Sequence, residues 1–308
     1  MINKFYLNRL SRRYTMRLKG VGFIMLAAIC WGLSGGIGDI LMNKGWDPIV
    51  ISFYRGAVGL VCFFAWFLLR SGQNWISSTH FHIWSVLAGV GVAGNFTFYF
   101  LSIELSSVAV AVTLMYTAPV FVLLISILLR LEPSTWFKWG SIFVVLMGII
   151  LLTGAYNIGS ISSSFSFLGT AAGIAAGLSY TLFIFGFKNA SSVGKPQASL
   201  TTAFFSFCLI LFMIMDKGQA VQVLTSRDIG WFILLGIMGA GISFILYVIG
   251  IRRTTPTNAS MVAMVEPVTA SLFGVFLIGD SLTFMQLLGM ALILVTTTLF
   301  SVKQTTEN

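Results

Sequence analysis

The sequence predicts an all-α polytopic membrane protein in which ten transmembrane helices form two inverted five-helix repeats. Three observations carry this prediction: an apolar composition, ten apolar runs of membrane-spanning length, and a set of residues that recurs about 148 positions later along the chain. Of the 308 residues, 57% are hydrophobic and 9% are charged, whereas soluble domains carry about a quarter charged residues. Lipid must therefore be the solvent for most of the chain.

The ten runs follow one another along almost the whole chain. A helix needs about 20 apolar residues to cross the ~30 Å hydrocarbon core of a bilayer. The first run follows a basic tail, as in a signal peptide, but it is too long for the apolar region of a cleaved one. The predicted spans are 19–41, 48–70, 82–102, 107–128, 135–154, 166–186, 197–215, 229–250, 256–278 and 283–302.

An internal duplication groups the spans into two sets of five. Pro119 in Ala-Pro-Val and Pro267 in Glu-Pro-Val are 148 residues apart, and each lies within a predicted span. Further pairs keep this register: Gly20 with Gly169, Trp31 with Tyr180, Trp84 with Trp231, Gly89 with Gly236, Gly94 with Gly241, Tyr99 with Tyr247, Ala111 with Ala259 and Glu132 with Asp280. Because five is odd, the second copy must enter the membrane from the opposite side, an arrangement typical of transporters.

The predicted organisation is a basic N-terminal tail (1–18), a first repeat (19–154), an outer linker (155–165), a second repeat (166–302) and a C-terminal tail (303–308). The linker is serine-rich, which is typical of a flexible connection. The other connections are short and leave no room for a catalytic domain outside the membrane. No pair of carboxylates and no His/Asp group occurs at bilayer depth, so we do not expect an enzyme.

The basic residues predict the orientation. With the N-terminus inside, 14 of the 18 Lys and Arg residues lie at the cytoplasmic side, while Lys44, Lys217 and Arg227 lie in outer loops and Arg55 lies within a span. Short cytoplasmic loops collect Lys and Arg, so both termini are predicted to be cytoplasmic in a multi-pass protein of the cell membrane. The same distribution accounts for the net charge of +9 without a nucleic-acid partner.

The sequence predicts no cofactor and no metal. The three cysteines, Cys30, Cys62 and Cys208, all lie in spans and offer neither a disulfide framework nor a metal-binding spacing. His80 and His82, in the loop before the third span, are too few for a haem or zinc site. The Gly-x-x-x-x-Gly-Lys-Ser/Thr motif is missing from the sequence, so this chain does not use ATP directly.

Several short motifs make the chain resemble the EamA-type branch of the drug/metabolite transporter superfamily over roughly residues 19–302. They are Leu-Ala-Ala-Ile-Cys-Trp-Gly (26–32), Tyr54-Arg55, Tyr116-Thr-Ala-Pro119, Leu131-Glu132, Val265-Glu266-Pro267 and Gly279-Asp280. The resemblance implies transport of small metabolites such as amino acids, amines, drugs or sugars, often outward. Thr202 occupies the position of Arg55 in the second copy, so the two halves present different charges.

Two charged residues lie deep in predicted spans and are candidates for substrate binding. A charge at the centre of a helix costs about 2.5–3.5 kcal/mol on insertion scales, so such a residue usually faces the bundle interior or a cavity. Glu266 lies near the midplane, about ten residues into the ninth span, and Arg55 lies about seven residues from the outer end of the second. A buried ion pair, or a carboxylate bonded to neighbouring backbone, is the structural alternative. Asp39, at the outer end of the first span, is predicted to be interfacial.

Buried polar and aromatic residues complete the predicted substrate site. Trp31, Tyr116 and Tyr180 lie deep enough that an indole N–H or a hydroxyl needs a partner, and Asn95 is a further buried polar candidate. Plain packing is the alternative for all of them. Aromatic residues near helix ends usually form an interfacial belt; this is predicted for Tyr54, Trp84, Tyr99 and Tyr247.

Proline and glycine residues predict helix geometry. Pro119 and Pro267 each remove a backbone donor from a span and are predicted to kink it; the kinks are static bends or hinges. Gly169, Gly173 and Gly177 form a stripe that predicts close helix packing rather than a ligand site.

The sequence thus predicts a secondary transporter that moves a small metabolite, an amino acid or related compound, outward across the cytoplasmic membrane by alternating access. An importer of an amine or sugar is the alternative within transport, and a membrane-embedded enzyme or structural subunit is the alternative of another class. The expected partners are the metabolite and the lipid bilayer, with no nucleic acid. Protons as coupling ion and a homodimer stay open.

Overall fold

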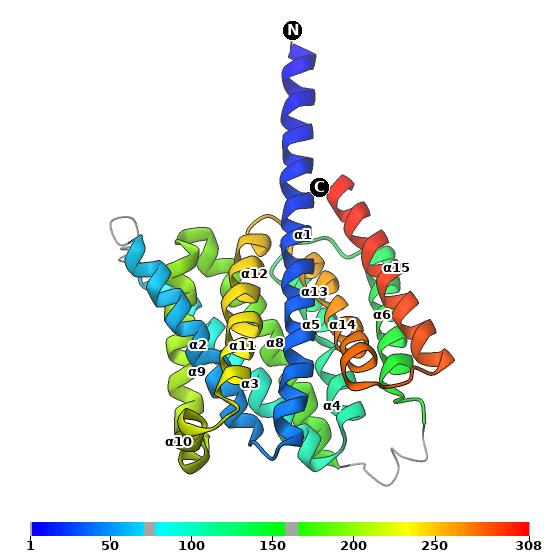
Figure 1. Ribbon diagram of the computed structural model, residues 1–308. Helices are drawn as coiled ribbons and strands as arrows, with labels where there is room; N and C mark the ends of the chain where they lie inside the picture. Colours follow the sequence, from blue (N-terminus) through cyan, green and yellow to red (C-terminus); the bar gives the residue numbers. More distant parts are fainter. Residues whose placement is uncertain (1, 71–77, 158–165, 308) are drawn as a thin grey trace.

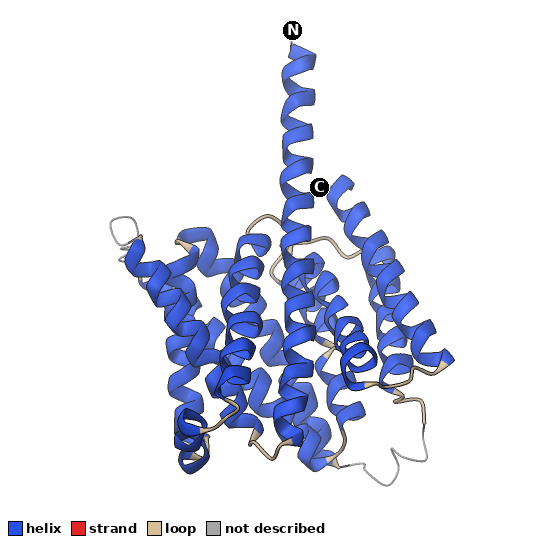
Figure 2. Ribbon diagram, viewed as in Figure 1, coloured by secondary structure: helices blue, strands red, loops and turns tan. Residues whose placement is uncertain are grey.

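The fold is a bundle of membrane-spanning helices. A computed structural model of the chain describes residues 2–70, 78–157 and 166–307. In these ranges the regular structure is helical and contains no strand (Figure 2). Ten of the described helices are long and apolar enough to cross a membrane, which confirms the predicted fold class. Residues 158–165 of the predicted linker lie outside the described residues.

The helices fall into two sets. The first repeat contains α1 (Ile2–Asn43), α2 (Pro48–Leu69), α3 (Thr79–Leu105), α4 (Val108–Met115), α5 (Ala118–Leu128) and α6 (Trp136–Thr153). The second contains α8 (Phe167–Val193), α9 (Pro196–Ile214), α10 (Lys217–Thr225), α11 (Ile229–Gly236), the π-helical turn η2 (Ile237–Ile242), α12 (Ser243–Ile251), α13 (Pro256–Ala263), α14 (Val265–Phe273), the π-helical turn η3 (Gly274–Ile278) and α15 (Phe284–Glu307).

The helix contacts follow the internal duplication. α1 packs against α12, α13 and α14, and its counterpart α8 packs against the corresponding helices of the first repeat, α3, α4 and α5. α2 packs against its own counterpart α9, and α6 packs against α15. Such reciprocal and self-paired contacts are what a two-fold relation between inverted repeats produces.

Both ends of the chain lie at the same side of the bundle, which we call the terminal face (Figure 1). The opposite face carries the α1–α2 and α3–α4 connections and α10, a short helix that the sequence analysis placed in a loop. Asp216 explains α10, because its carboxylate accepts hydrogen bonds from Gly218 N (2.8 Å) and Gln219 N (3.1 Å) at the start of the helix. His80 and His82, also predicted in a loop, lie in the first turn of α3.

Polar contacts fix the α1–α2 connection at the opposite face. Asp47 caps α2 through Ile49 N (2.8 Å), and its own N–H donates to Gln219 Oε1 of α10 (2.8 Å). Asp228, before α11, pairs with Lys44 and accepts a hydrogen bond from Trp46 Nε1 (3.0 Å). The Lys44 ammonium and the Trp46 indole lower the pKa of Asp228. The connection is thereby joined to the second repeat.

The fourth and ninth spans are both interrupted near their middle. α4 ends at Met115 and α5 begins at Ala118, while α13 ends at Ala263 and α14 begins at Val265. At both interruptions an N–H bonds three residues back, Thr117 N to Leu114 O and Met264 N to Met261 O, each at 3.1 Å. Pro119 and Pro267 follow directly, and each lacks the N–H that would continue the α-helical ladder.

The predicted glycine stripe on α8 packs closely, as expected. A Cβ added at Gly173 would lie 2.7 Å from Leu114 Cδ1, and one at Gly177 would lie 3.2 Å from Met115 O. Met115 O is the carbonyl that the N–H of residue 119 would bond if it were not proline. The stripe therefore lets α8 approach the interruption between α4 and α5.

Candidate functional site

A cavity of about 1210 Å³ lies between the two repeats. Its lining includes the exposed Asp39 and part of the α1–α2 connection, so it opens at the opposite face. All six residues predicted to bind substrate line this one cavity: Trp31, Arg55, Asn95, Tyr116, Tyr180 and Glu266. Pro267 also lines it, whereas Pro119 is buried outside the lining.

Glu266 is placed by the helix interruption. It is the second residue of α14, directly after the break at Met264, and its side chain is only partly buried because it faces the cavity. Gly32 lets α14 approach α1 at this level, since a Cβ there would lie 2.6 Å from Glu266 O. The described part of the chain donates no hydrogen bond to the Glu266 carboxylate. A cation in the cavity would find this acceptor free.

Arg55 projects into the cavity from α2. Its Nε donates to Gly239 O (3.0 Å) in the π-helical turn η2, and its guanidinium carbon lies 4.8 Å from the ring centroid of Phe96. Gly239 makes room for it, because a Cβ there would lie 2.6 Å from Arg55 Nε. Arg55 and Glu266 form no ion pair at contact distance, although their charges interact across the cavity.

Tyr116 and Asn95 line the cavity from the first repeat. Tyr116 lies at the interruption between α4 and α5 and is buried. Asn95, on α3, donates its Nδ2 to Ala176 O of α8 at 3.0 Å. That hydrogen bond joins the two repeats, so part of the Asn95 side chain has a structural role.

The end of the cavity nearer the terminal face is closed by an aromatic plug, formed by Trp31 of α1, Tyr180, Phe183 and Phe187 of α8, and Phe244 and Tyr247 of α12. The Trp31 ring centroid lies 5.1 Å from both Phe244 and Tyr247. Trp31 and Tyr180 line the cavity. Their polar atoms, Trp31 Nε1 and Tyr180 OH, are buried and have no hydrogen-bond partner within the described chain. Buried donors without partners are costly, so a ligand oxygen that reached either atom would be stabilised by the hydrogen bond.

Two residues predicted in the interfacial belt lie elsewhere. Tyr247 belongs to the plug with 0% of its surface exposed, and its counterpart Tyr99 lines the cavity. The belt prediction failed for both because depth along a helix does not specify which way the side chain points. Phe96, beside Arg55, also lines the cavity, although the sequence analysis did not identify it. Its counterpart 148 positions later is Phe244 of the plug, and this repeat pair could have identified Phe96 from the sequence.

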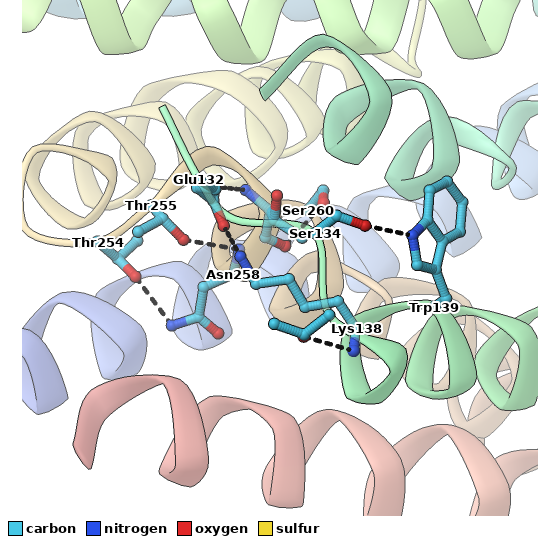
Figure 3. A network of polar contacts seen from close by, with 10 residues as sticks. Glu132, Ser134, Lys138, Trp139, Thr254, Thr255, Asn258 and Ser260 are labelled. Carbon is cyan, nitrogen blue, oxygen red and sulfur yellow. Dashed lines mark hydrogen bonds and ion pairs between the residues drawn. The ribbon is translucent and has the colours of Figure 1, made fainter. Parts of the chain in front are cut away.

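At the terminal face, the buried carboxylate of Glu132 joins the two repeats. Lys138 Nζ lies 2.7 Å from Glu132 Oε2, and Glu132 Oε1 accepts a hydrogen bond from Thr257 N at the start of α13 (3.1 Å). Figure 3 shows Glu132 in the α5–α6 connection next to the start of α13. A carboxylate at a helix N-terminus also interacts favourably with the helix dipole. We call this contact the Glu132 latch.

Comparisons with known proteins agree with this architecture. The family model described as the EamA-like transporter family matches residues 18–154 and 167–302. An uncharacterized transporter of Archaeoglobus fulgidus is 28% identical over 89% of this chain and 93% of its own length. The threonine/homoserine exporter RhtA of Escherichia coli is 24% identical over 67% of this chain and 66% of its own. One solved crystal structure with 17% identity superposes with a TM-score of 0.67, covering 96% of this chain and 98% of the other, and so has the same fold.

Proposed function

Because the chain belongs to the EamA-like transporter family, we propose that it exports a small zwitterionic metabolite, an amino acid or a close relative, across the cytoplasmic membrane by alternating access. The observation that carries the proposal is the placement of Glu266, Arg55 and unpartnered aromatic donors in one cavity. The name of the Escherichia coli relative, a threonine/homoserine exporter, makes threonine the first substrate to test.

The residues offer one contact for each part of such a substrate. Glu266 would bind the ammonium group, Arg55 the carboxylate, and Trp31, Tyr116 and Tyr180 the remainder. An ammonium beside aromatic rings gains about 0.5–2 kcal/mol depending on desolvation. The Trp31 N–H and the Tyr180 hydroxyl would donate to substrate oxygens. A neutral sugar would leave both charged residues without a partner.

Alternating access is supported by the inverted pairing of the plug residues. Phe244 and Tyr247 pack in the plug near the terminal face, and their counterparts Phe96 and Tyr99 line the open cavity. In a second state with the roles of the repeats exchanged, Phe96 and Tyr99 would close the opposite face and the plug would open. The interruptions near Pro119 and Pro267 are the places where the fourth and ninth spans could bend.

Transport assays test the proposal directly. The purified protein in liposomes should move labelled threonine or another amino acid in a saturable manner, and protein-free liposomes should not. A pH gradient of either sign would reveal proton coupling as a change in rate. Failure to transport any amino acid, together with transport of a sugar or a simple amine, would reject the substrate class.

Arg55→Gln should weaken binding of an amino acid and spare its decarboxylated amine. Hydrogen bonds to charged groups contribute about 1.5–3 kcal/mol, which corresponds to roughly a 10- to 150-fold loss of affinity for the carboxylate-bearing ligand. The measurement is competition for transport by both ligands. Arg227→Gln, at an exposed position outside the cavity, is the control and should resemble wild type. An equal loss for both ligands would remove Arg55 from the proposed role.

The terminal face should be cytoplasmic, because it holds most of the basic residues. Single cysteines in place of the exposed Lys217 and Lys195, in a variant whose three native cysteines are alanine, would report the two faces. An impermeant thiol reagent added to intact cells should label Lys217→Cys at the opposite face but not Lys195→Cys at the terminal face. The reverse labelling pattern would show that the terminal face lies outside the cell and would contradict the predicted orientation.

A further inference from the structure

The terminal face contains a second pocket, separate from the central cavity. It has a volume of about 340 Å³ and lies between α1, α8, α13 and α15. Four of its lining residues are cationic, Arg17, Lys188, Arg252 and Arg253, and its lining contains no carboxylate. We propose that this pocket binds the phosphate group of an anionic phospholipid.

The positive charge in the pocket is not neutralised within the described chain. The ion pairs within the described chain are Lys44 with Asp228 and Lys138 with Glu132, and both lie outside the pocket. None of the four pocket cations therefore has a carboxylate from this part of the chain at contact distance. Glu132 is within electrostatic range of Lys188, but both of its oxygens are already used by the latch. Cationic residues gathered from separate helices without a counterion are suited to bind an anion.

Lys188 is held in place with a donor to spare. Its ammonium donates to the carbonyl of Ile251, the last residue of α12 (2.9 Å), and to that of Thr254 in the connection after it (2.6 Å). An ammonium has three N–H donors, so one is left for a ligand. Arg253 is also positioned, with its guanidinium carbon 5.5 Å from the ring centroid of Phe23. Lys188 and Arg253 are therefore positioned by contacts with their neighbours, and Arg252 and Arg253 are exposed to solvent at the pocket.

Asn258 provides an independent indication of a ligand. This residue lines the pocket with only 3% of its surface exposed, and its Nδ2 donates to Thr254 Oγ1 at 2.8 Å. Its Oδ1 is buried and has no hydrogen-bond partner. The hydroxyl of a glycerol head group would supply the missing donor, which favours a head group that carries both phosphate and hydroxyl.

The surroundings favour a lipid over a free phosphate. Met16 next to Arg17 is 51% exposed, and Val302 on α15 is 48% exposed. α1 and α15 also extend furthest at the terminal face (Figure 1). These apolar side chains would lie along acyl chains while the head group occupies the pocket.

Thermal unfolding in nanodiscs tests the proposal. Replacing part of a phosphatidylcholine bilayer with phosphatidylglycerol should raise the melting temperature of the wild type by roughly 5 °C, because a ligand that binds only the folded state stabilises it. In Arg252→Gln/Arg253→Gln at least half of this shift should disappear. Arg70→Gln/Lys195→Gln is the matched control: it removes two exposed charges outside the pocket and should keep the shift.

Further variants keep the test decisive if the double variant does not fold. Asn258→Asp is nearly isosteric and places a negative charge beside the phosphate, so it should also lose the shift. Glycerol 3-phosphate added to phosphatidylcholine nanodiscs distinguishes a lipid from a water-soluble phosphate. If it raises the melting temperature of the wild type but not of the same variants, the pocket binds a phosphate that enters from water. Absence of any shift in the wild type, or an equal loss in the control, would overturn the proposal. None of these readouts depends on transport.

Discussion

Glu266→Gln is expected to abolish transport while leaving membrane insertion and folding intact. Its carboxylate faces the cavity and accepts no hydrogen bond from the described chain, so the substitution breaks no native hydrogen bond. An unpaired substrate ammonium in a desolvated site would cost about 3–5 kcal/mol, equivalent to a loss of affinity of more than about 100-fold. Uptake of labelled threonine into liposomes at several substrate concentrations measures the effect.

Glu104→Gln is the matched control, because Glu104 is an exposed carboxylate near the end of α3, where the cavity opens at the opposite face. It should transport at close to the wild-type rate. Both variants should elute as single species and unfold near the wild-type temperature. A Glu266→Gln protein that transports like wild type would show that the midplane carboxylate does not bind the substrate.

Glu132→Ala is expected to cause the largest loss of stability. It leaves Lys138, only 2% exposed, without its ion pair and removes the acceptor for Thr257 N. Removing one partner of a buried pair costs about 3–5 kcal/mol, so the melting temperature should fall by roughly 5–10 °C.

Two variants separate the contributions of the latch. Glu132→Gln keeps an oxygen for Thr257 N and should lose less than Glu132→Ala. Glu132→Gln/Lys138→Met removes both charges and should recover most of the stability, since replacing a buried pair by neutral groups is often nearly neutral. If the double variant is as unstable as Glu132→Ala, the unpaired Lys138 charge is not the cause.

The sequence was sufficient to predict the fold class and six of the residues that line the cavity. Glu266 and Arg55 were identifiable because charge is expensive at bilayer depth, and the interruptions followed from the register of Pro119 and Pro267. The placement of Tyr99 and Tyr247 was not predictable in this way. Aromatic residues are acceptable both at an interface and in a core, so only helix rotation, set by packing against neighbours, distinguishes the two.

The basic residues show the same limit. Their number and their position at helix ends predicted an orientation. The basic pocket at the terminal face, however, depends on which helix ends lie side by side in the fold. Lys188 and Arg252 are 64 positions apart and lie together because α8 and α12 both end at the terminal face. The pairing of Lys138 with Glu132 likewise depends on how the α5–α6 connection turns back over α13.

The unequal partners in the two repeats have a thermodynamic consequence. If the repeats were identical, exchanging their conformations would give a state of equal free energy, and the two openings would be equally populated. Arg55 bonds to Gly239 O, whereas Thr202, its counterpart, bears no charge; Trp31 is likewise paired with Tyr180. Each difference of about 1.4 kcal/mol between counterpart contacts changes the ratio of the two states tenfold. In the proposed alternating-access cycle, a few such substitutions would set which side of the membrane the empty protein faces at rest, without any change in the shared architecture.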